Sequence, residues 1–310
     1  MASSSAPGKI ILFGEHAVVY GRPALAIPVS EVQATATVSA NPRGGVWIES
    51  PGIELSCELS LLTTEHPLAA VIHSAFSALG ITRLPACTIH LESTIPVAAG
   101  LGSGAAISIA ILRALSEHLG ARLSDEQVNR LAFEVEKIHH GMPSGIDNTV
   151  ITYARPVYYI KGEPIKTFRV GAEFTIVIGD TGISAPTKES VGAVHRLWET
   201  DMLRWEKIFD QVGEIVWEAR QAIECGDNAE LGRLMDANHA LLQEMTVSSV
   251  ELDHLTEAAH KSGAQGAKLC GGGRGGNMIA LVDKVNAPAL AEALLTAGAK
   301  RTIVTTISQI

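Results

Sequence analysis

Apolar and polar positions alternate along this 310-residue chain with two different periods. Apolar residues three or four positions apart are typical of helices, and short apolar runs rich in β-branched residues are typical of strands. Helices are predicted at 67–79, 105–119, 125–139, 190–225 (allowing one interruption), 229–245, 250–262 and 288–297. Strands are predicted at 9–13, 24–29, 34–39, 88–91, 157–160, 174–178, 267–269, 277–282 and 301–308. The mixture indicates an α+β protein.

Two of the predicted helices begin with a capping box. In this motif a serine hydroxyl and a Glu or Gln three residues later satisfy backbone N–H groups of the first helical turn. Ser124 with Gln127 opens the third predicted helix, and Ser248 with Glu251 opens the sixth. These pairs predict where both helices begin.

The predicted elements fall into two halves of different character. Strands and shorter helices mix in the first half, whereas long helices rich in charged residues follow residue 182. A chain of this length commonly forms two domains. We expect the boundary near 171–182 and assign 1–170 to an N-terminal domain and 171–310 to a C-terminal domain.

Composition excludes several broad classes of protein. Hydrophobic residues make up 46% and charged residues 18% of the chain, which is typical of globular rather than disordered proteins. The formal net charge of −9 produces a negative field that repels nucleic acids and anionic membranes. Pro96 and several glycines interrupt the uncharged stretch between Glu92 and Arg113, which favours a buried helix over a membrane span. We therefore expect no nucleic-acid or membrane partner.

The four cysteines, at 57, 87, 225 and 270, are scattered along the sequence. No pair has the spacing of a zinc site, and the pattern does not indicate a disulfide framework. Reduced thiols are typical of the cytosol, and the only apolar run near the N-terminus is too short for a signal peptide. We expect a cytoplasmic protein.

The segment Gly100-Leu101-Gly102-Ser103-Gly104-Ala105 reads as a glycine-rich loop that leads directly into the predicted helix 105–119. The first N–H groups of a helix have no partner inside the helix, and the helix dipole adds partial positive charge there. Glycines let the backbone approach an anion closely. The loop therefore predicts a phosphate site, although similar loops also occur without a ligand.

Two widespread nucleotide-binding loops fit this segment poorly. The Gly-x-Gly-x-x-Ala pattern of dinucleotide-binding proteins requires a strand immediately before it. The predicted strand 88–91 ends well before Gly100, and Pro96 intervenes. The chain also contains no Gly-x-x-x-x-Gly-Lys-Ser/Thr motif. A different kind of nucleotide site is needed.

Four sequence clusters together resemble the motifs of the GHMP small-molecule kinases. They are Ala6-Pro7-Gly8-Lys9 with Gly14-Glu15-His16, the glycine loop, Glu136 with Gly141–Asn148, and Gly271–Gly276. Within this family, the opening APGKIILFGEHAVVYG at 6–21 is most similar to that of the mevalonate kinases. It differs from the Asn-Leu-Ile-Gly-Glu-His-Thr-Asp pattern typical of galactokinases.

The resemblance implies an α+β, two-domain GHMP kinase fold, with an N-terminal ribosomal-protein-like α/β domain and a C-terminal ferredoxin-like domain. It implies that ATP and Mg²⁺ serve to phosphorylate the 5-hydroxyl of (R)-mevalonate, giving 5-phosphomevalonate for isoprenoid biosynthesis. A homodimer is expected. The alternatives are another GHMP kinase, acting on phosphomevalonate, a sugar or homoserine, and a non-catalytic ligand-binding relative.

The resemblance assigns the chemistry to three residues. Asp147 is the implied acceptor of the substrate's hydroxyl proton, and Lys9 is implied to stabilise the charge of Asp147 and of the reacting oxygen. Which of the two contributes more is open. Glu136, eleven residues before Asp147, is the implied Mg²⁺ ligand, since hard cations prefer carboxylate and phosphate oxygens. Residue types alone favour a solvated Glu136 beside Lys137 and a turn-capping Asp147.

The resemblance also implies the residues that hold the nucleotide and the acceptor substrate. The nucleotide residues are Ala98, Ala99, Gly100, Leu101, Gly102, Ser103, Gly104 and Ala105, together with Gly272 and Gly273. The substrate residues are Glu15, His16, Ser144 and Thr187. Lys188 either meets a substrate carboxylate or is solvated.

Three positions depart from the family pattern. Gly104 replaces the second serine of the usual Gly-Leu-Gly-Ser-Ser-Ala motif, whose hydroxyl normally binds Mg²⁺. Ser103, a water or no group then takes that place, and we assign Ser103 with Glu136 to the metal. Cys270 stands where Ser or Thr is common, and Arg274 where Gly is common. The Arg274 guanidinium either contacts a phosphate or faces solvent.

Overall fold

The computed structural model of the chain describes residues 1–96, 100–140, 143–164, 166–184 and 186–309. Its internal contacts define two compact units. Unit 1 comprises Met1–Lys9, Pro28–Val97 and Leu101–Arg155, and unit 2 comprises Ile10–Ile27, Ala98–Gly100 and Pro156–Ile310. Strands β1 (Ala2–Phe13) and β2 (Ala24–Ala40) contribute residues to both units. The assignment of 1–170 and 171–310 to two domains stays a prediction.

The strands of unit 1 follow the order β4-β3-β5-β2, and β1 pairs with β2. The new strands are β3 (Val46–Ser50), β4 (Leu55–Glu58) and β5 (Cys87–Ser93). β5 runs antiparallel to β2 and parallel to β3. Alternate side chains, such as Ile48 and Ile89, are fully buried, as expected of a sheet with one face on the core.

The strands predicted at 24–29 and 34–39 form one continuous strand, β2. The exposed Ser30 and Glu31 interrupt the apolar pattern, and this interruption led to the prediction of two strands. The fixed φ of Pro28 is compatible with extended backbone, so the strand continues through the whole segment.

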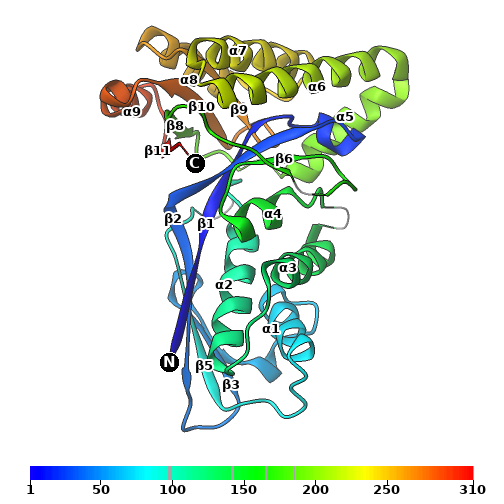
Figure 1. Cartoon of the computed structure of the whole chain (residues 1–310), viewed down its shortest axis with the longest axis vertical. Coiled ribbons are helices and arrows are strands. Elements are labelled where there is room, and N and C mark those ends of the chain that lie inside the picture. Colours follow the sequence, from blue (N-terminus) through cyan, green and yellow to red (C-terminus); the bar gives the residue numbers. More distant parts are fainter. Residues whose placement is uncertain (97–99, 141–142, 165, 185, 310) are drawn as a thin grey trace. The chain divides into compact units, whose positions relative to one another are not determined.

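Four helices form one layer of unit 1 (Figure 1). They are α1 (Pro67–Ala78), α2 (Ser103–His118), α3 (Asp125–His140) and α4 (Ile146–Tyr153). α2 lies against β5 and contacts the other three helices. The predicted capping box of α3 is confirmed, since the Ser124 N–H donates to Gln127 Oε1 at 2.8 Å and the Gln127 N–H donates to Ser124 Oγ at 3.3 Å.

Unit 2 contains an antiparallel four-stranded sheet in the order β11-β8-β10-β9. Its strands are β8 (Phe174–Asp180), β9 (Gly266–Cys270), β10 (Asn277–Val282) and β11 (Arg301–Ile307). All residues of β8, β9 and β10 are buried. The short strands β6 (Val157–Tyr159) and β7 (Lys166–Thr167) pair with each other, and β6 also pairs with Ala24–Ala26 of β2.

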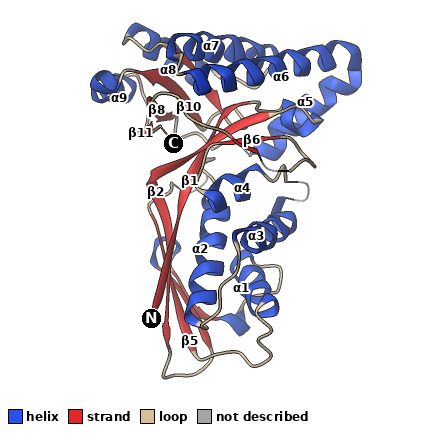
Figure 2. Ribbon diagram, viewed as in Figure 1, coloured by secondary structure: helices blue, strands red, loops and turns tan. Residues whose placement is uncertain are grey.

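Helices cover one face of this four-stranded sheet (Figure 2). They are α7 (Asn228–Glu244), α8 (Val250–Lys261) and α9 (Ala287–Thr296). The long helix α6 (Met202–Cys225) contacts α7, and α5 (Thr187–Thr200) precedes α6 in the chain. The helix predicted at 190–225 is interrupted at Asp201, which caps α6 by accepting the Arg204 N–H at 3.2 Å.

The prediction that Ser248 caps α8 is wrong. The cap is Ser249, whose Oγ accepts the Leu252 N–H at 3.3 Å. Ser248 instead donates its hydroxyl hydrogen to Asp253. The three-residue spacing rule selects Ser248, because Glu251 follows it by three residues, whereas Leu252 stands at that position after Ser249.

Side chains of α7 occupy the outer edge of β9, the edge strand of the sheet. The outward amides of Ala267 and Leu269 donate to Asp236 Oδ1 at 2.8 Å and to His239 Nδ1 at 3.2 Å. An exposed strand edge normally leaves such donors free. Here the helix that covers the sheet also satisfies its edge.

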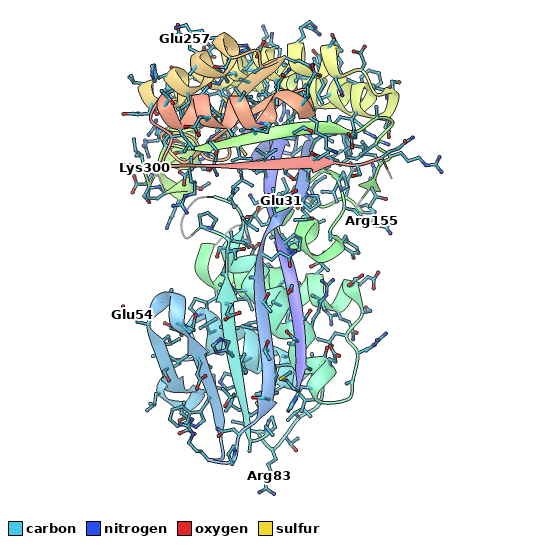
Figure 3. All side chains as sticks on the ribbon, turned by 90° about the vertical axis from the view of Figure 1, so that its left-hand side faces the viewer. Glu31, Glu54, Arg83, Arg155, Glu257 and Lys300 are labelled. Carbon is cyan, nitrogen blue, oxygen red and sulfur yellow. The ribbon has the colours of Figure 1, made fainter. Side chains whose placement is uncertain are left out.

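Glu257 of α8 and Lys300 just before β11 are examples of charged side chains at the surface of unit 2 (Figure 3). Cys57, Cys87, Cys225 and Cys270 are all free thiols. Across the described ranges, none of the helices combines the length and the apolar character needed to cross a bilayer.

Candidate active site

An ion pair in unit 1 joins Lys9 and Asp147, which are far apart in the sequence. The Lys9 Nζ lies 2.8 Å from Asp147 Oδ1. The Lys9 side chain is 6% exposed, whereas that of Asp147 is 32% exposed. A buried ammonium requires a compensating negative charge. The carboxylate supplies this charge and remains accessible to a molecule that arrives from solvent.

The local sequence positions both members of this pair. The Lys9 N–H donates to Leu101 O at 3.0 Å, which fixes β1 against the glycine loop. Asp147 lies in the first turn of α4, a helix that was predicted only as a turn. Gly145 precedes this helix with a φ of 86°, and Ser144 Oγ accepts the Ile146 N–H at 3.3 Å.

Glu136 of α3 belongs to the same electrostatic cluster. The pKa of Glu136 is raised to about 8, first by burial and then by the negative charge of Asp147, with the positive charge of Lys9 opposing the change. A carboxyl group with such a pKa lacks sufficient positive charge around it. A divalent cation would supply that charge, so the site fits a hard cation.

The cluster offers only part of a metal shell. Within the described ranges, no three His, Cys, Asp or Glu residues come together as a metal site. Mg²⁺ commonly uses one or two protein carboxylates and takes its remaining oxygens from phosphate and water. Glu136 fits that mode as the single protein carboxylate.

The glycine loop lies directly against Lys9. Gly102 has a φ of 76° and precedes the first residue of α2. A Cβ added there would lie 2.8 Å from Ile151 Cδ1 and 3.0 Å from Lys9 Cγ. Both the backbone conformation and the close approach to Lys9 therefore require glycine at this position.

The structure describes some, but not all, of the other residues predicted to form the nucleotide loop. Ser103, Gly104 and Ala105 form the first turn of α2, where N–H groups are available to an anion. Gly100 has a φ of 72°. Ala98 and Ala99 lie outside the described residues. A Cβ at Gly104 would meet no atom within 4 Å, so space does not explain why glycine replaces serine there.

Gly102 and Gly104 should respond oppositely to the same substitution. We expect Gly102→Ala to lower the free energy of unfolding by about 1–3 kcal/mol, because it combines a left-handed backbone with overpacking. Gly104→Ala is the matched control and should raise it by up to about 1 kcal/mol, because it restricts the unfolded chain. Urea unfolding measures both values, and equal effects of the two substitutions would contradict this assignment.

A second cluster, in unit 2, contains Glu15 and His16. Lys268 of β9 donates to Glu15 Oε1 through a short ion pair and to Leu269 O at 2.7 Å. The Lys268 and Glu15 side chains are 0% and 1% exposed. Oε1 of Glu15, a predicted substrate residue, is therefore already bound by Lys268 of the same chain.

The ring of His16 is fixed by the glycine segment that follows β9. Its Nε2 lies 3.1 Å from Gly272 O. A carbonyl oxygen only accepts, so Nε2 carries the hydrogen and Nδ1 is an acceptor. The pKa of His16 is lowered to about 4, mainly by burial and also by the charges of Arg274 and Lys268, whereas the hydrogen bond to Gly272 opposes the change.

The lowered pKa of His16 makes stability depend on pH. Between about pH 6.5 and 4, the unfolded chain binds a proton at this histidine that the folded protein does not. The contribution of His16 to folding stability is therefore complete above pH 6.5 and is lost as the pH falls, by at most about 1.4 kcal/mol per pH unit. His16→Gln should flatten the curve of unfolding free energy against pH in this window. Parallel curves for the two proteins would refute the prediction.

The glycine segment 271–276 packs closely on its neighbours. A Cβ at Gly273 would lie 1.9 Å from Val247 O, and one at Gly272 would lie 3.0 Å from Thr187 Oγ1. Thr187 is exposed at the start of α5, and Lys188 beside it is also exposed. The structure thus brings the predicted residues His16, Gly272 and Thr187 together within unit 2.

Arg274 adopts the left-handed backbone that glycine provides elsewhere. Its φ is 61°, its N–H donates to Val247 O at 2.7 Å, and its Nε donates to Thr246 O at 3.3 Å. The departure from glycine at this position therefore leaves the loop conformation intact, at the cost of backbone strain.

Lys268 is the charged residue at this cluster that motif reasoning missed. It lies inside the predicted strand 267–269, between Ala267 and Leu269. A lysine within a strand flanked by apolar residues is a signal of a buried ion pair, since lysine is rarely buried without a partner. The partner, Glu15, is distant in the sequence, so the sequence does not reveal the pair.

Two family models match the chain. The model described as GHMP kinases N terminal domain matches residues 67–155, and the model described as GHMP kinases C terminal matches residues 218–300. Together they cover more than half of the chain.

Individual proteins extend the similarity to nearly the whole chain. The mevalonate kinase of Thermococcus gammatolerans is 38% identical over 300 residues, which cover 90% of this chain and 88% of that protein. The mevalonate kinase of Thermococcus sibiricus is 36% identical over 324 residues, covering 99% and 96%. The crystal structure of L. major mevalonate kinase in complex with R-mevalonate has a TM-score of 0.86 at 29% identity, covering 100% of this chain and 96% of that chain.

Proposed function

Because this chain belongs to the GHMP kinase family, we propose that it transfers the γ-phosphoryl group of ATP to the 5-hydroxyl of (R)-mevalonate. The family and the two-domain GHMP kinase fold predicted from the sequence are confirmed. The identity of the acceptor is supported by the mevalonate kinases that resemble the chain from end to end. The observation that carries the chemistry is the 2.8 Å pair of Lys9 and Asp147.

In the proposed reaction, Asp147 accepts the proton of the 5-hydroxyl as its oxygen attacks the γ-phosphorus. The new O–P bond forms, the bond to the departing ADP oxygen breaks, and the proton stays on the carboxyl group. Lys9 stabilises the negative charge that develops on the attacking oxygen. Positioning and charge neutralisation provide most of the catalysis in such reactions, which suits a buried cation held beside an accessible carboxylate.

The phosphates of ATP are proposed to bind at the glycine loop. Gly100 to Ala105 would present backbone N–H groups at the start of α2, and Ala98, Ala99, Gly272 and Gly273 are assigned to the nucleotide by motif resemblance alone. Glu136 and Ser103 would hold Mg²⁺, which when bound neutralises phosphate charge. The raised pKa of Glu136 supports this placement.

The remaining assignments extend the proposal. Glu15, His16, Ser144 and Thr187 are proposed to contact the acceptor substrate. The protein is also proposed to form a homodimer and to be cytoplasmic. The four free cysteines support the cytoplasmic location.

The test is an ADP-release assay with a panel of acceptors, namely mevalonate, phosphomevalonate, galactose and homoserine, with product identity confirmed by ³¹P NMR. We expect turnover with mevalonate and 5-phosphomevalonate as the product. Higher kcat/KM with another acceptor would reassign the substrate. Nucleotide binding without turnover of any acceptor would indicate a non-catalytic relative.

A further inference from the structure

The helix that carries Asp147 is too short to hold its own position. α4 contains eight residues, follows Gly145, whose φ is 86°, and precedes Ala154, whose φ is 47°. Isolated helices of this length are marginal in water, so contacts with the rest of the protein determine where they lie. The placement of the Asp147 carboxylate therefore depends on the contacts that fix α4.

The side chain of Asn148, the residue after Asp147, connects α4 to α3. Its Nδ2 donates to the backbone oxygen of Asn129 at 3.2 Å and also to Asn129 Oδ1. A carbonyl oxygen only accepts, so these contacts fix the orientation of the Asn148 amide. Asn148 is 2% exposed, and hydrogen bonds shielded from water are stronger than exposed ones. The two bonds tie the start of α4 to the second turn of α3.

The same amide keeps a buried oxygen without a donor. Asn148 Oδ1 has no hydrogen-bond partner among the residues that the structure describes. A buried polar atom that lacks a partner is costly, and an apolar side chain at this position would avoid the cost. The amide thus makes its two contacts with Asn129 at the expense of an unpaired acceptor. This is the pattern of a residue that fixes geometry rather than one that only fills the core.

The two helices joined in this way each contribute a carboxyl group to the candidate active site. Asp147 of α4 lies 2.8 Å from Lys9, and Glu136 of α3 belongs to the same electrostatic cluster. Reacting groups must be held within a fraction of an ångström of their working geometry. A tether between α3 and α4, next to Asp147 in the chain, holds this geometry.

We propose that Asn148 is a positioning residue, which holds Asp147 in place for proton acceptance by tying α4 to Asn129 of α3. The inference rests on the proposed function, in which Asp147 takes the proton of the substrate hydroxyl. Asn148 acts through Asp147, and its amide takes no part in the proton transfer. Loss of the tether should therefore lower kcat only while Asp147 is present.

The test compares the same substitution with and without Asp147. Asn148→Ala removes both hydrogen bonds to Asn129 and should lower kcat by about 100-fold, which is the effect of displacing a reacting group by about 1 Å. The KM values for ATP and mevalonate should change by less than about threefold, because the contacts that bind the substrates remain. In the Asp147→Asn background, the same substitution should change kcat by less than about twofold, because no proton acceptor is left to position.

Variants of Asn129 and a matched control on α4 separate positioning from general damage. Asn129→Asp keeps an oxygen for Nδ2 and should retain kcat within about threefold, whereas Asn129→Leu loses the Oδ1 acceptor and should lower kcat by about tenfold. Thr152 lies one turn further along α4, is 2% exposed, and has no partner for Oγ1 in the described part of the chain. Thr152→Val should therefore leave kcat unchanged. Circular dichroism checks that each variant folds, and the two Asn129 variants decide the question if Asn148→Ala does not.

Equal losses of kcat in the two backgrounds would overturn the inference, because they would show that Asn148 acts independently of Asp147. A loss expressed in KM rather than kcat would overturn it as well, as would equal losses in Asn129→Asp and Asn129→Leu or a comparable loss in Thr152→Val. Turnover of a different acceptor by the unaltered chain would change the proposed substrate, and the variants would then be compared with that acceptor. Absence of turnover with every acceptor would refute the proposed function and this inference with it, and is seen before any variant is compared.

Discussion

Replacement of Asp147 by asparagine is expected to lower kcat by about a thousandfold, because it removes the proton acceptor beside the reacting hydroxyl. Asparagine keeps the shape of the side chain but cannot take the proton, and it replaces the carboxylate 2.8 Å from the Lys9 ammonium with a neutral amide. Steady-state kinetics with saturating ATP and mevalonate measure the loss. Asp147→Ala should be at least as impaired.

Asp125→Asn is a matched control in the same unit. Asp125 pairs with Arg113 at the surface and its side chain is 53% exposed, so its replacement should change stability by less than about 1 kcal/mol and leave kcat unchanged. Full activity of Asp147→Ala would rule out the role assigned to Asp147.

Lys9→Met tests whether Lys9 or Asp147 contributes more to catalysis. A larger loss in kcat than that of Asp147→Asn would make Lys9 the dominant group.

Lys268→Met should produce the largest change in stability. The substitution leaves the carboxylate of Glu15, which is 1% exposed, without its cation in a buried environment. Removing one partner of a buried ion pair lowers the free energy of unfolding by about 3–5 kcal/mol. Urea unfolding followed by far-UV circular dichroism measures the difference.

The double variant Glu15→Gln with Lys268→Met tests whether the pair is the cause. It should recover most of the lost stability, because neither uncompensated charge remains. Lys284→Met, which breaks a pair with Glu173 whose members are 64% and 50% exposed, should cost less than about 1 kcal/mol. Additive effects of the two buried substitutions would show that Lys268 acts independently of Glu15.

Local patterns predicted most elements of the fold. The Ser124–Gln127 box and the apolar spacing after it located α3, and most of the predicted strands lie within strands of the structure. β3 and β4 were missed because their five and four residues are too short for a clear alternation. α4 was missed because its glycine and proline start resembles a turn.

The candidate site was predictable only in part. The resemblance to a family selected Lys9, Asp147 and Glu136, and the structure brings these three residues into one cluster. No spacing rule links positions so far apart in the sequence. The pairing of Glu15 with Lys268 was also invisible for this reason, because it depends on how β9 and the chain before η1 (Ala17–Tyr20) fold together.

The side chains of Asp236 and His239 give the edge strand β9 a further property. Because its outward amides at Ala267 and Leu269 already have acceptors, an extended peptide from another molecule would find neither of these two donors free along that side. The sheet of unit 2 is thereby shielded from growth by strand addition at β9. Edge-to-edge pairing of this four-stranded sheet with a second copy would have to use its opposite border, at β11.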